Sequence, residues 1–233
     1  TVAVVGGGLT GIEAATEIAE SHPRATVRLV TGEPFGDRLS AAGRRHLHRT
    51  FDRLGIDIVE NATVVKVGPD GLVLGDDTTV DADAVVWTTG FRVPGLAREA
   101  GLTVDDNGRM VVDESLRSVS HPEVYGVGDA AAARMPNGGP ELRMACATGL
   151  PSAVYVARGI ARRLRGQQEK PLKYRFFNQC ISLGRRDGLV QFTRADDSPV
   201  EAILTGRLAA LYKEAIVRGT VQAQRPPALM NIV

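Results

Sequence analysis

The chain has 233 residues, which is enough for two modest domains or one large one. Its composition, with 43% hydrophobic and 24% charged residues, is that of an ordinary soluble globular protein. Lys and Arg number 28 against 27 for Asp and Glu, and the net charge of +1 argues against a strongly basic nucleic-acid-binding protein. We therefore expect no nucleic acid among its partners.

Cysteine usage and hydropathy argue against further classes. The two cysteines, Cys146 and Cys180, are far apart and form no C-x-x-C pair, which argues against a redox dithiol, a zinc site and a disulfide framework. We interpret both as packed apolar side chains rather than catalytic thiols. No run of apolar residues approaches the length of a membrane span. We predict no metal site and a reducing, cytoplasmic setting.

The first predicted element is a strand that ends at Val5, and a helical pattern follows from about residue 9. The turn between them has the Gly-x-Gly-x-x-Gly pattern, in which the first glycine allows a tight reversal. The second lets a pyrophosphate approach the backbone, and the third lets the helix pack against its strand. The N–H groups and dipole of the helix start would bind the phosphate charge. We predict nucleotide binding here, with a purely structural turn as the alternative. The predicted binding residues are Gly6, Gly8, Leu9, Thr10 and Gly11.

Residues 25–30 form a second predicted strand and complete a β-α-β unit. In NAD-binding turns an acidic residue near the end of this strand binds the ribose hydroxyls. Thr31 takes that place here, Glu33 follows two residues later, and the nearest arginine that would suit NADP is Arg38. The pattern favours NADH over NADPH, and a solvated loop carboxylate is the alternative for Glu33.

A basic helix is predicted over residues 40–54, and it contains His46 and His48. Two histidines at this spacing lie on different sides of a helix, so we expect surface or partly packed side chains rather than a shared metal. Short strands with turns between them follow, as expected for antiparallel strands attached to a parallel sheet. These predicted antiparallel strands are residues 62–67, 71–74 and 78–81. A separate short strand is predicted before them at 55–60, and a buried strand at 82–87 runs into Thr88-Thr89-Gly90.

The pattern changes after Phe91. We predict a short helix at residues 96–101, an extended segment at 108–113, a strand at 124–129, and a long helix at 143–164 that is interrupted near Gly149 and Pro151. After a polar linker, strands are predicted at 173–177 and 189–192. A final helix is predicted from about 201 to 217.

Three segments in this order resemble the flavoprotein reductases with two dinucleotide-binding folds, where an NAD domain is inserted in an FAD domain. They are the glycine turn with Glu13, Thr88-Thr89-Gly90, and Val124-Tyr-Gly-Val-Gly128-Asp129. Within that superfamily the chain is most similar to type II NADH dehydrogenases. The supporting residues are 87–90, 116–125, 170–174 and 182–188.

The resemblance implies an α/β fold with three parts. These are a Rossmann-like NAD(P)-binding domain with a parallel sheet plus a β-hairpin (1–92), a returning part of an FAD-binding domain (93–168), and a small α+β C-terminal segment (169–233). It implies a pyridine nucleotide-disulphide oxidoreductase that passes hydride from NADH to FAD and then to a quinone or another acceptor.

The resemblance also implies roles for individual residues. Glu13 would lie near the nicotinamide and flavin as a catalytic carboxylate, with an ordinary first-turn acid as the alternative. Asp129, next to Gly128, would accept hydrogen bonds from flavin hydroxyls, with a turn aspartate as the alternative. Thr148 would lie under the flavin pyrimidine, or cap its helix. In the strand-end motif, Thr89 and Gly90 would contact cofactor.

Two departures from the family pattern bear on function. Leu150, Val154 and Tyr155 stand where the family's glutamine-bearing quinone motif would fall, which weakens the expectation of a quinone acceptor. No Gly-x-Gly-x-x-Gly turn of an FAD half precedes Thr1, so we expect a fragment that lacks the N-terminal FAD-binding half and holds FAD poorly. A non-catalytic NAD(P)H-binding or interaction module is therefore the alternative function.

The last predicted helix is amphipathic, with apolar residues at helical spacing from Leu204 to Ala215 and basic residues around them. Packing onto the core is the favoured interpretation. The alternative is peripheral attachment to the inner face of a membrane, because basic amphipathic helices also bind anionic lipid. A homodimer is left open.

Overall fold

The computed structural model describes residues 1–136 and 138–224, and the chain divides into two compact units. The first unit is Thr1–Gly90 with Phe176–Gln222, and the second is built on Phe91–Arg175. The predicted three-part division differs from these units, because the C-terminal segment packs with the N-terminal part of the chain.

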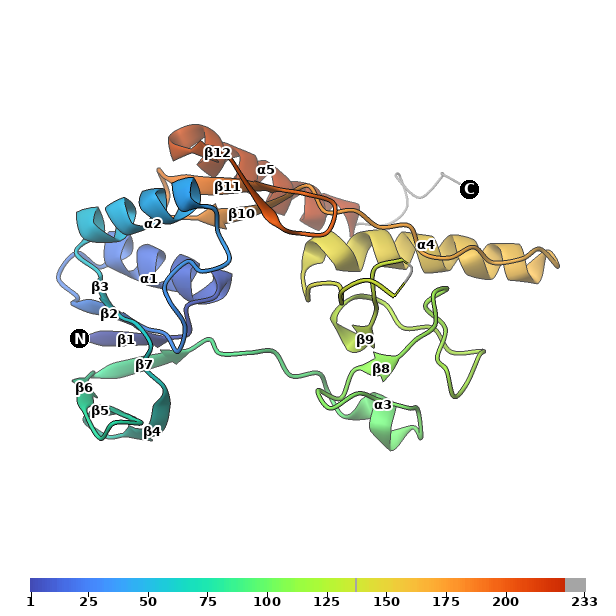
Figure 1. Ribbon diagram of the computed structural model, residues 1–233, viewed down its shortest axis with the longest axis horizontal. Coiled ribbons are helices and arrows are strands. Elements are labelled where there is room, and N and C mark those ends of the chain that lie inside the picture. Colours follow the sequence, from blue (N-terminus) through green and yellow to red (C-terminus); the bar gives the residue numbers. More distant parts are fainter. Residues whose placement is uncertain (137, 225–233) are drawn as a thin grey trace. The chain divides into compact units, whose positions relative to one another are not determined.

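The first unit is built on a four-stranded parallel sheet of order β3-β2-β1-β7 (Figure 1). Its remaining elements are three helices, α1, α2 and α5, and two three-stranded antiparallel sheets, β4-β5-β6 and β10-β11-β12. The element bounds are β1 Val2–Val5, α1 Leu9–Ser21, β2 Val27–Val30, α2 Ala41–Leu54, β3 Asp57–Val59, β4 Val64–Gly68, β5 Gly71–Leu74, β6 Thr79–Asp81, β7 Ala84–Trp87, β10 Asn178–Ser182, β11 Gly188–Thr193, β12 Pro199–Thr205 and α5 Gly206–Ala223. The predicted α/β class, with a parallel sheet and antiparallel hairpin strands, is confirmed.

Side chains alternate between the two faces of the parallel sheet, so each strand contributes to two cores. On one face Ala3, Val5 and Val30 pack against the β4-β5-β6 sheet. On the other face Val4 and Leu29 pack against α1 and α2. Burial on both faces explains why the inner strand β1 is a continuous run of small apolar residues.

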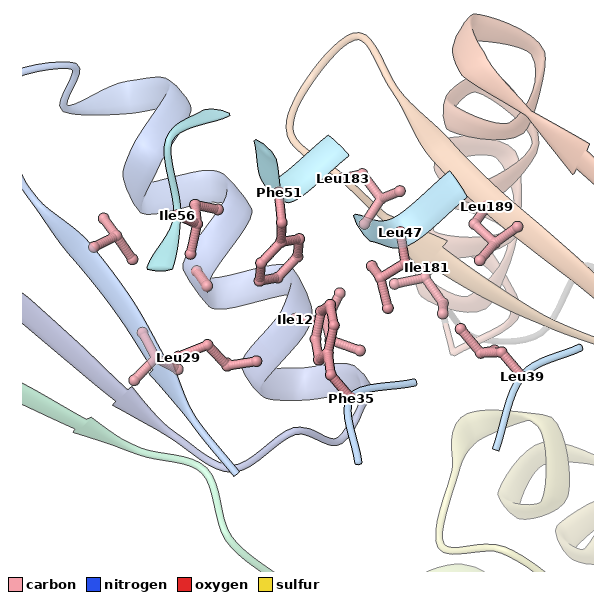
Figure 2. Packing of buried hydrophobic residues seen from close by; sticks show 13 residues of the cluster. Ile12, Leu29, Phe35, Leu39, Leu47, Phe51, Ile56, Ile181, Leu183 and Leu189 are labelled. Carbon is pink, nitrogen blue, oxygen red and sulfur yellow. The ribbon is translucent and has the colours of Figure 1, made fainter. Parts of the chain in front are cut away.

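The C-terminal sheet completes the second of these cores. Three of its side chains, Ile181, Leu183 and Leu189, are almost wholly buried and join the cluster formed by the parallel sheet and its helices (Figure 2). Gln191 is also buried, and its Oε1 accepts hydrogen bonds from Ser40 N (3.0 Å) and Ser40 Oγ (2.8 Å) at the start of α2. This packing places the segment in the first unit.

Two predicted C-terminal elements were wrong. Residues 173–177 form no strand, and pairing starts at Asn178 instead. The final helix begins at Gly206, because residues 201–205 pair antiparallel with β11 as part of β12. Gly206 has φ +71°, a conformation that suits glycine at the change from strand to helix.

The second unit contains α3, a short parallel pair of strands, a 3₁₀ turn and one long helix. The bounds are α3 Leu96–Glu99, β8 Met110–Val111, η1 Gly128–Ala130, β9 Ala131–Ala132 and α4 Cys146–Leu164. The predicted strand at 124–129 is not formed. Within this segment Tyr125 alone makes a bridge, to Arg117. A single bridge is not a strand, because a strand pairs with a neighbouring strand along its length.

The long helix α4 was predicted to be interrupted, and it is not. It begins at Cys146 and continues through Gly149 and Pro151. A proline inside a helix cannot donate to the carbonyl four residues earlier. That carbonyl, Ala147 O, accepts a hydrogen bond of 2.6 Å from the Tyr174 hydroxyl, which compensates for the missing N–H.

The carboxylate of Asp187, which precedes β11, links the C-terminal sheet to the side of α2. Its five hydrogen-bond donors are His46 Nε2 (3.1 Å), Thr50 Oγ1 (3.1 Å), Arg53 Nη2 (3.0 Å), Gly188 N (2.8 Å) and Gly206 N (3.0 Å). Burial by itself raises the pKa of Asp187. The charge of His46 and the hydrogen bonds outweigh burial, so the pKa lies below its ordinary value.

We expect Asp187→Asn to lower the free energy of unfolding by about 2 kcal/mol at pH 7, because the Arg53 guanidinium and several hydrogen-bond donors lose a charged acceptor. Because the pKa of Asp187 is lower in the folded state than in the unfolded state, ionised Asp187 stabilises the fold at pH values above its unfolded-state pKa of about 4. This stabilisation is lost as the pH falls through the folded-state pKa of Asp187. The wild-type advantage in urea denaturation should therefore shrink between pH 7 and pH 3. Asp106→Asn, at an exposed aspartate that makes no hydrogen bond or ion pair among the described residues, is the control and should be nearly neutral. An equal effect of both substitutions would contradict the assignment.

Candidate functional site

The glycine turn lies at the carboxyl ends of β1, β2 and β7, where ligands bind in open parallel sheets. Gly6 has φ +119° and donates its N–H to Val30 O (2.8 Å). A Cβ added to Gly6 would lie 2.6 Å from Thr88 Oγ1, and that hydroxyl donates to Val5 O (2.7 Å). The first glycine is therefore required both for its backbone conformation and for its contact with β7.

The other two glycines of the turn have opposite environments. A Cβ on Gly11 would lie 1.9 Å from Gly6 O, so only glycine permits this approach of α1 to the end of β1. A Cβ on Gly8 would meet no atom within 4 Å, and Gly8 has ordinary angles of φ −72° and ψ 175°. Neither internal packing nor backbone strain requires a glycine at position 8. The space beside its backbone is open to a ligand.

The start of α1 is suited to bind an anion. Gly8 is the N-cap and provides no side-chain hydrogen bond, and the helix's own bonding starts with Ile12 N to Gly8 O (3.1 Å). The N–H groups of the preceding residues, Leu9 to Gly11, point out of the helix end without an intrahelical partner. With the helix dipole, this end has the chemistry of a diphosphate site.

The loop after β2 contains the two residues predicted to contact ribose. Thr31 is buried, and its hydroxyl both donates to Glu33 O (3.1 Å) and accepts from Glu33 N (3.3 Å). The hydroxyl therefore closes a local turn. The Glu33 carboxylate is exposed and forms no hydrogen bond or ion pair within the described part of the chain. Of the two, Glu33 is the side chain that is free to reach a ligand.

Glu13 lies in the second turn of α1, so its reading as a first-turn acid was wrong. Its Oε1 accepts a hydrogen bond from Ser182 N (2.9 Å) and lies 3.1 Å from Lys213 Nζ. Lys213 also donates to Cys180 O (3.0 Å). The carboxylate is thus held by the C-terminal sheet and α5, and its predicted catalytic role stays a prediction. Neither Ser182 nor Lys213 was expected here, because the sequence gives no sign that α5 meets α1.

The strand-end motif also contains a residue that sequence reasoning missed. Thr89 and Gly90 were predicted to contact cofactor, and both are exposed beyond the end of β7, with Gly90 at φ +66°. The residue that contacts the glycine turn is Thr88. In the register of β1 with β7, Trp87 lies opposite Val5, so Thr88 lies beside Gly6. This strand register is the signal that could have identified Thr88.

The predicted residues of the second unit lie where η1 meets α4. Gly128 has φ +61°, donates its N–H to Ser152 Oγ (3.1 Å), and would meet Gly149 Cα at 3.4 Å if it carried a Cβ. Asp129 is exposed, and its carboxylate makes no hydrogen bond or ion pair among the described residues. It is available to a ligand. It does not line the small cavity behind η1.

Thr148 is the third residue of α4 and is buried. Its hydroxyl donates to Arg143 O (2.6 Å) and Ala145 O (2.7 Å), so it fixes the segment that enters the helix. No side chain caps the start of α4, which leaves its first N–H groups for a ligand. Tyr155, at a position expected for the quinone motif, is half-buried, and this burial raises the pKa of its phenol.

The chain matches known proteins over most of its length. The profile described as pyridine nucleotide-disulphide oxidoreductase matches residues 1–159. A probable NADH dehydrogenase of Dictyostelium discoideum is 26% identical over 94% of this chain and 51% of its own length. An NADH dehydrogenase-like protein of Mycobacterium tuberculosis is 31% identical over 79% of this chain and 48% of its own length. The chain thus spans about half the length of the curated relatives it matches.

A solved structure shows the same fold. NDH2 from Plasmodium falciparum, in complex with NADH, superposes with a TM-score of 0.76 at 12% identity. The match covers 93% of this chain and 61% of that one.

The contrast between Gly11 and Gly8 gives a stability test. We expect Gly11→Ala to lower the free energy of unfolding by about 3 kcal/mol, because its Cβ would collide with the Gly6 carbonyl. Gly8→Ala should lower the free energy of unfolding by about 1 kcal/mol or less, because alanine is a poorer N-cap residue than glycine. Urea denaturation followed by circular dichroism measures both, and similar losses for the two variants would contradict the described geometry.

Proposed function

The chain belongs to the pyridine nucleotide-disulphide oxidoreductase family, and we propose that it is part of an NADH dehydrogenase-like flavoprotein. In this proposal the first unit binds NADH and the second unit supplies some of the contacts to FAD. The enzyme transfers a hydride from NADH to the flavin and passes the electrons to a quinone or another acceptor.

The observation that carries the proposal is the open backbone at Gly8. Gly6 and Gly11 are required by internal contacts, whereas Gly8 has free space beside it and an uncapped helix start behind it. A dinucleotide diphosphate needs this combination of close approach and N–H donors. The turn therefore fits the pyrophosphate of a nicotinamide dinucleotide.

The free carboxylate of Glu33 supports NADH as the nucleotide. A carboxylate at the end of the second strand can accept hydrogen bonds from ribose hydroxyls, and it would repel the 2′-phosphate of NADPH. The names of the relatives agree with this preference, since two are called NADH dehydrogenase or NADH dehydrogenase-like and the solved structure contains NADH. NADPH is the less favoured alternative.

The residues of the second unit fit a role in holding FAD. The unpartnered carboxylate of Asp129 can accept hydrogen bonds from ribityl hydroxyls, and the uncapped start of α4 after Ala145 can stabilise negative charge on a reduced ring. When bound, FAD supplies the acceptance of a hydride. Glu13, whose side chain is fixed in position by Lys213 and Ser182, is the residue we propose to orient the nicotinamide carboxamide or to handle a proton.

A second function is favoured by one observation. The nucleotide turn is complete within this chain, whereas the groups that we assign to FAD among the described residues lie in the η1 turn and at the start of α4. A non-catalytic NADH-binding module would need only the former. The two functions differ in whether flavin is retained and reduced.

The C-terminal helix α5 carries the surface that we propose for peripheral membrane contact. Leu208 and Leu211 are 66% and 65% exposed, and Val217 is 49% exposed. Among the described residues, the helices are too short or too polar to cross a bilayer. Contact through α5 would therefore be with the membrane surface.

We expect Gly8→Val to weaken NADH binding by at least tenfold, because the side chain would fill the space that the diphosphate needs. Isothermal titration calorimetry measures this, with NADPH titrated in parallel. Gly219→Val is the matched control, since Gly219 also has open space around its Cβ position and lies on α5. Unchanged NADH affinity in Gly8→Val would remove the turn from the binding site.

The longer protein that contains this chain should be yellow when purified, and NADH should bleach its flavin absorbance in the absence of air. Asp129→Ala should lower the flavin content per polypeptide, because it removes the proposed acceptor for the ribityl hydroxyls. Asp106→Ala, at another exposed aspartate of the second unit, should leave the flavin content unchanged. A colourless protein that still binds NADH would support the binding module instead.

A further inference from the structure

The outer side of α2 and the loop before it form an open groove of about 660 Å³. The groove lies in the first unit and is separate from the glycine turn. Its lining residues are Pro34, Phe35, Ala41, Arg44, Arg45, His48, Arg49, Asp52 and Glu60.

Positive charge is concentrated on this helix far beyond what the composition suggests. The whole chain is nearly neutral, with 28 basic and 27 acidic residues. Between Ala41 and Leu54, however, four arginines and two histidines accompany one acid, Asp52. Arg45 and Arg49 are four residues apart, and like charges at this spacing destabilise a helix. The repulsion between Arg45 and Arg49 destabilises α2, and an anionic ligand bound to both side chains would relieve it.

The arginines of the groove have no protein partner. Within residues 1–136 and 138–224, Arg44, Arg45 and Arg49 make no ion pair or hydrogen bond through their guanidinium groups. Arg53, one turn beyond Arg49, contrasts with them because it pairs with Asp187 at 3.0 Å. The guanidinium groups of these three arginines therefore remain free to bind a ligand.

Two of the basic side chains are held in place by packing. The stem of Arg44 lies over Gly36, where an added Cβ would be 3.0 Å from Arg44 Cγ. The His48 ring makes an edge contact with the buried Phe35 ring, at 5.2 Å between centroids and an angle of 89°. These contacts leave less side-chain freedom to be lost when a ligand binds.

The carboxylates near the groove form no ion pairs with its arginines among the described residues. Glu60 accepts a hydrogen bond from Phe35 N, so its carboxylate is directed to the backbone of the loop. Asp52 forms no ion pair with Arg49, although it lies one turn further along the same helix. Three guanidinium groups thus line the groove together with two carboxylates, Asp52 and Glu60, and the Glu201 carboxylate accepts hydrogen bonds from the backbone at the start of α2.

We propose that this groove binds a soluble ligand with two or more linked phosphate groups, such as a nucleoside diphosphate. Guanidinium groups bind phosphate oxygens in pairs, and the groove volume lies within the range of small-molecule sites. Arg44, Arg45 and Arg49 bind the phosphates, and His48 lies at the same wall. The groove shares no residue with the glycine turn, and its lining residue Pro34 directly follows Glu33, the residue that we propose for the ribose.

The test uses inorganic pyrophosphate as the probe, titrated calorimetrically into the chain that carries Gly8→Val. That substitution fills the nucleotide turn, so the heat that remains reports the groove. Arg45→Ala with Arg49→Ala should weaken pyrophosphate binding by about tenfold or more, and added salt should weaken it further. Circular dichroism checks that the helix persists. ADP is titrated in parallel, and tighter binding of ADP than of pyrophosphate would show that the groove also contacts the nucleoside.

The matched control is Arg158→Ala with Arg207→Ala. It removes two exposed helical arginines that have no ion pair among the described residues. This variant should bind pyrophosphate as tightly as the parent. Equal losses in the two double variants would overturn the proposal. It would also be overturned if Gly8→Val alone abolished pyrophosphate binding, or if neither probe bound more tightly than about 1 mM.

Discussion

The close approach of Gly11 to the carbonyl of Gly6 is the constraint on which the rest of the first unit depends. No other residue type could bring α1 this near to the end of β1, because the next atom would lie 1.9 Å from an oxygen. That contact sets the direction of the helix, and the helix start in turn leaves Gly8 and its N–H groups facing open space. The same helix presents Ile12 and Ala15 to the core on the sheet side. Geometry at one glycine therefore couples the ligand site to the packing of the unit.

The nucleotide-binding part is also attached firmly to a segment far away in the sequence. Buried Gln191 binds the start of α2, Asp187 binds its side, and Lys213 reaches Glu13 on α1. These polar contacts surround an apolar cluster to which the C-terminal sheet contributes three buried side chains. Glu13 is the proposed catalytic carboxylate. Because Lys213 on α5 contacts it, the orientation of Glu13 depends on α5 as well as on α1. The C-terminal segment is thus part of the architecture of the nucleotide-binding unit.

Much of the fold could be predicted from local patterns. The glycine turn, the β-α-β unit and the hairpin strands follow from short-range signals, and the helix after Ser40 starts where its capping residue indicates. What failed depended on distant partners. Residues 201–205 became a strand because β11 is available to pair with them, and residues near Tyr125 did not, for want of a neighbour. In the site, the glycines were visible from spacing alone, whereas Lys213 and Thr88 became visible only through tertiary contacts and strand register.

The chain order of the two units has a consequence for synthesis. The second unit interrupts the first, since the chain leaves the first unit after Gly90 and returns to it at Phe176. Proteins emerge from the ribosome amino end first, and domains generally fold as they appear. The apolar side chains that cover α1 and α2, including Ile181 and Leu189, are translated only after the whole intervening unit. The nascent nucleotide-binding unit must therefore wait, with one side of its helices uncovered, until some 85 further residues have been made. During that interval we expect the incomplete nucleotide-binding unit to bind chaperones that recognise exposed apolar surface.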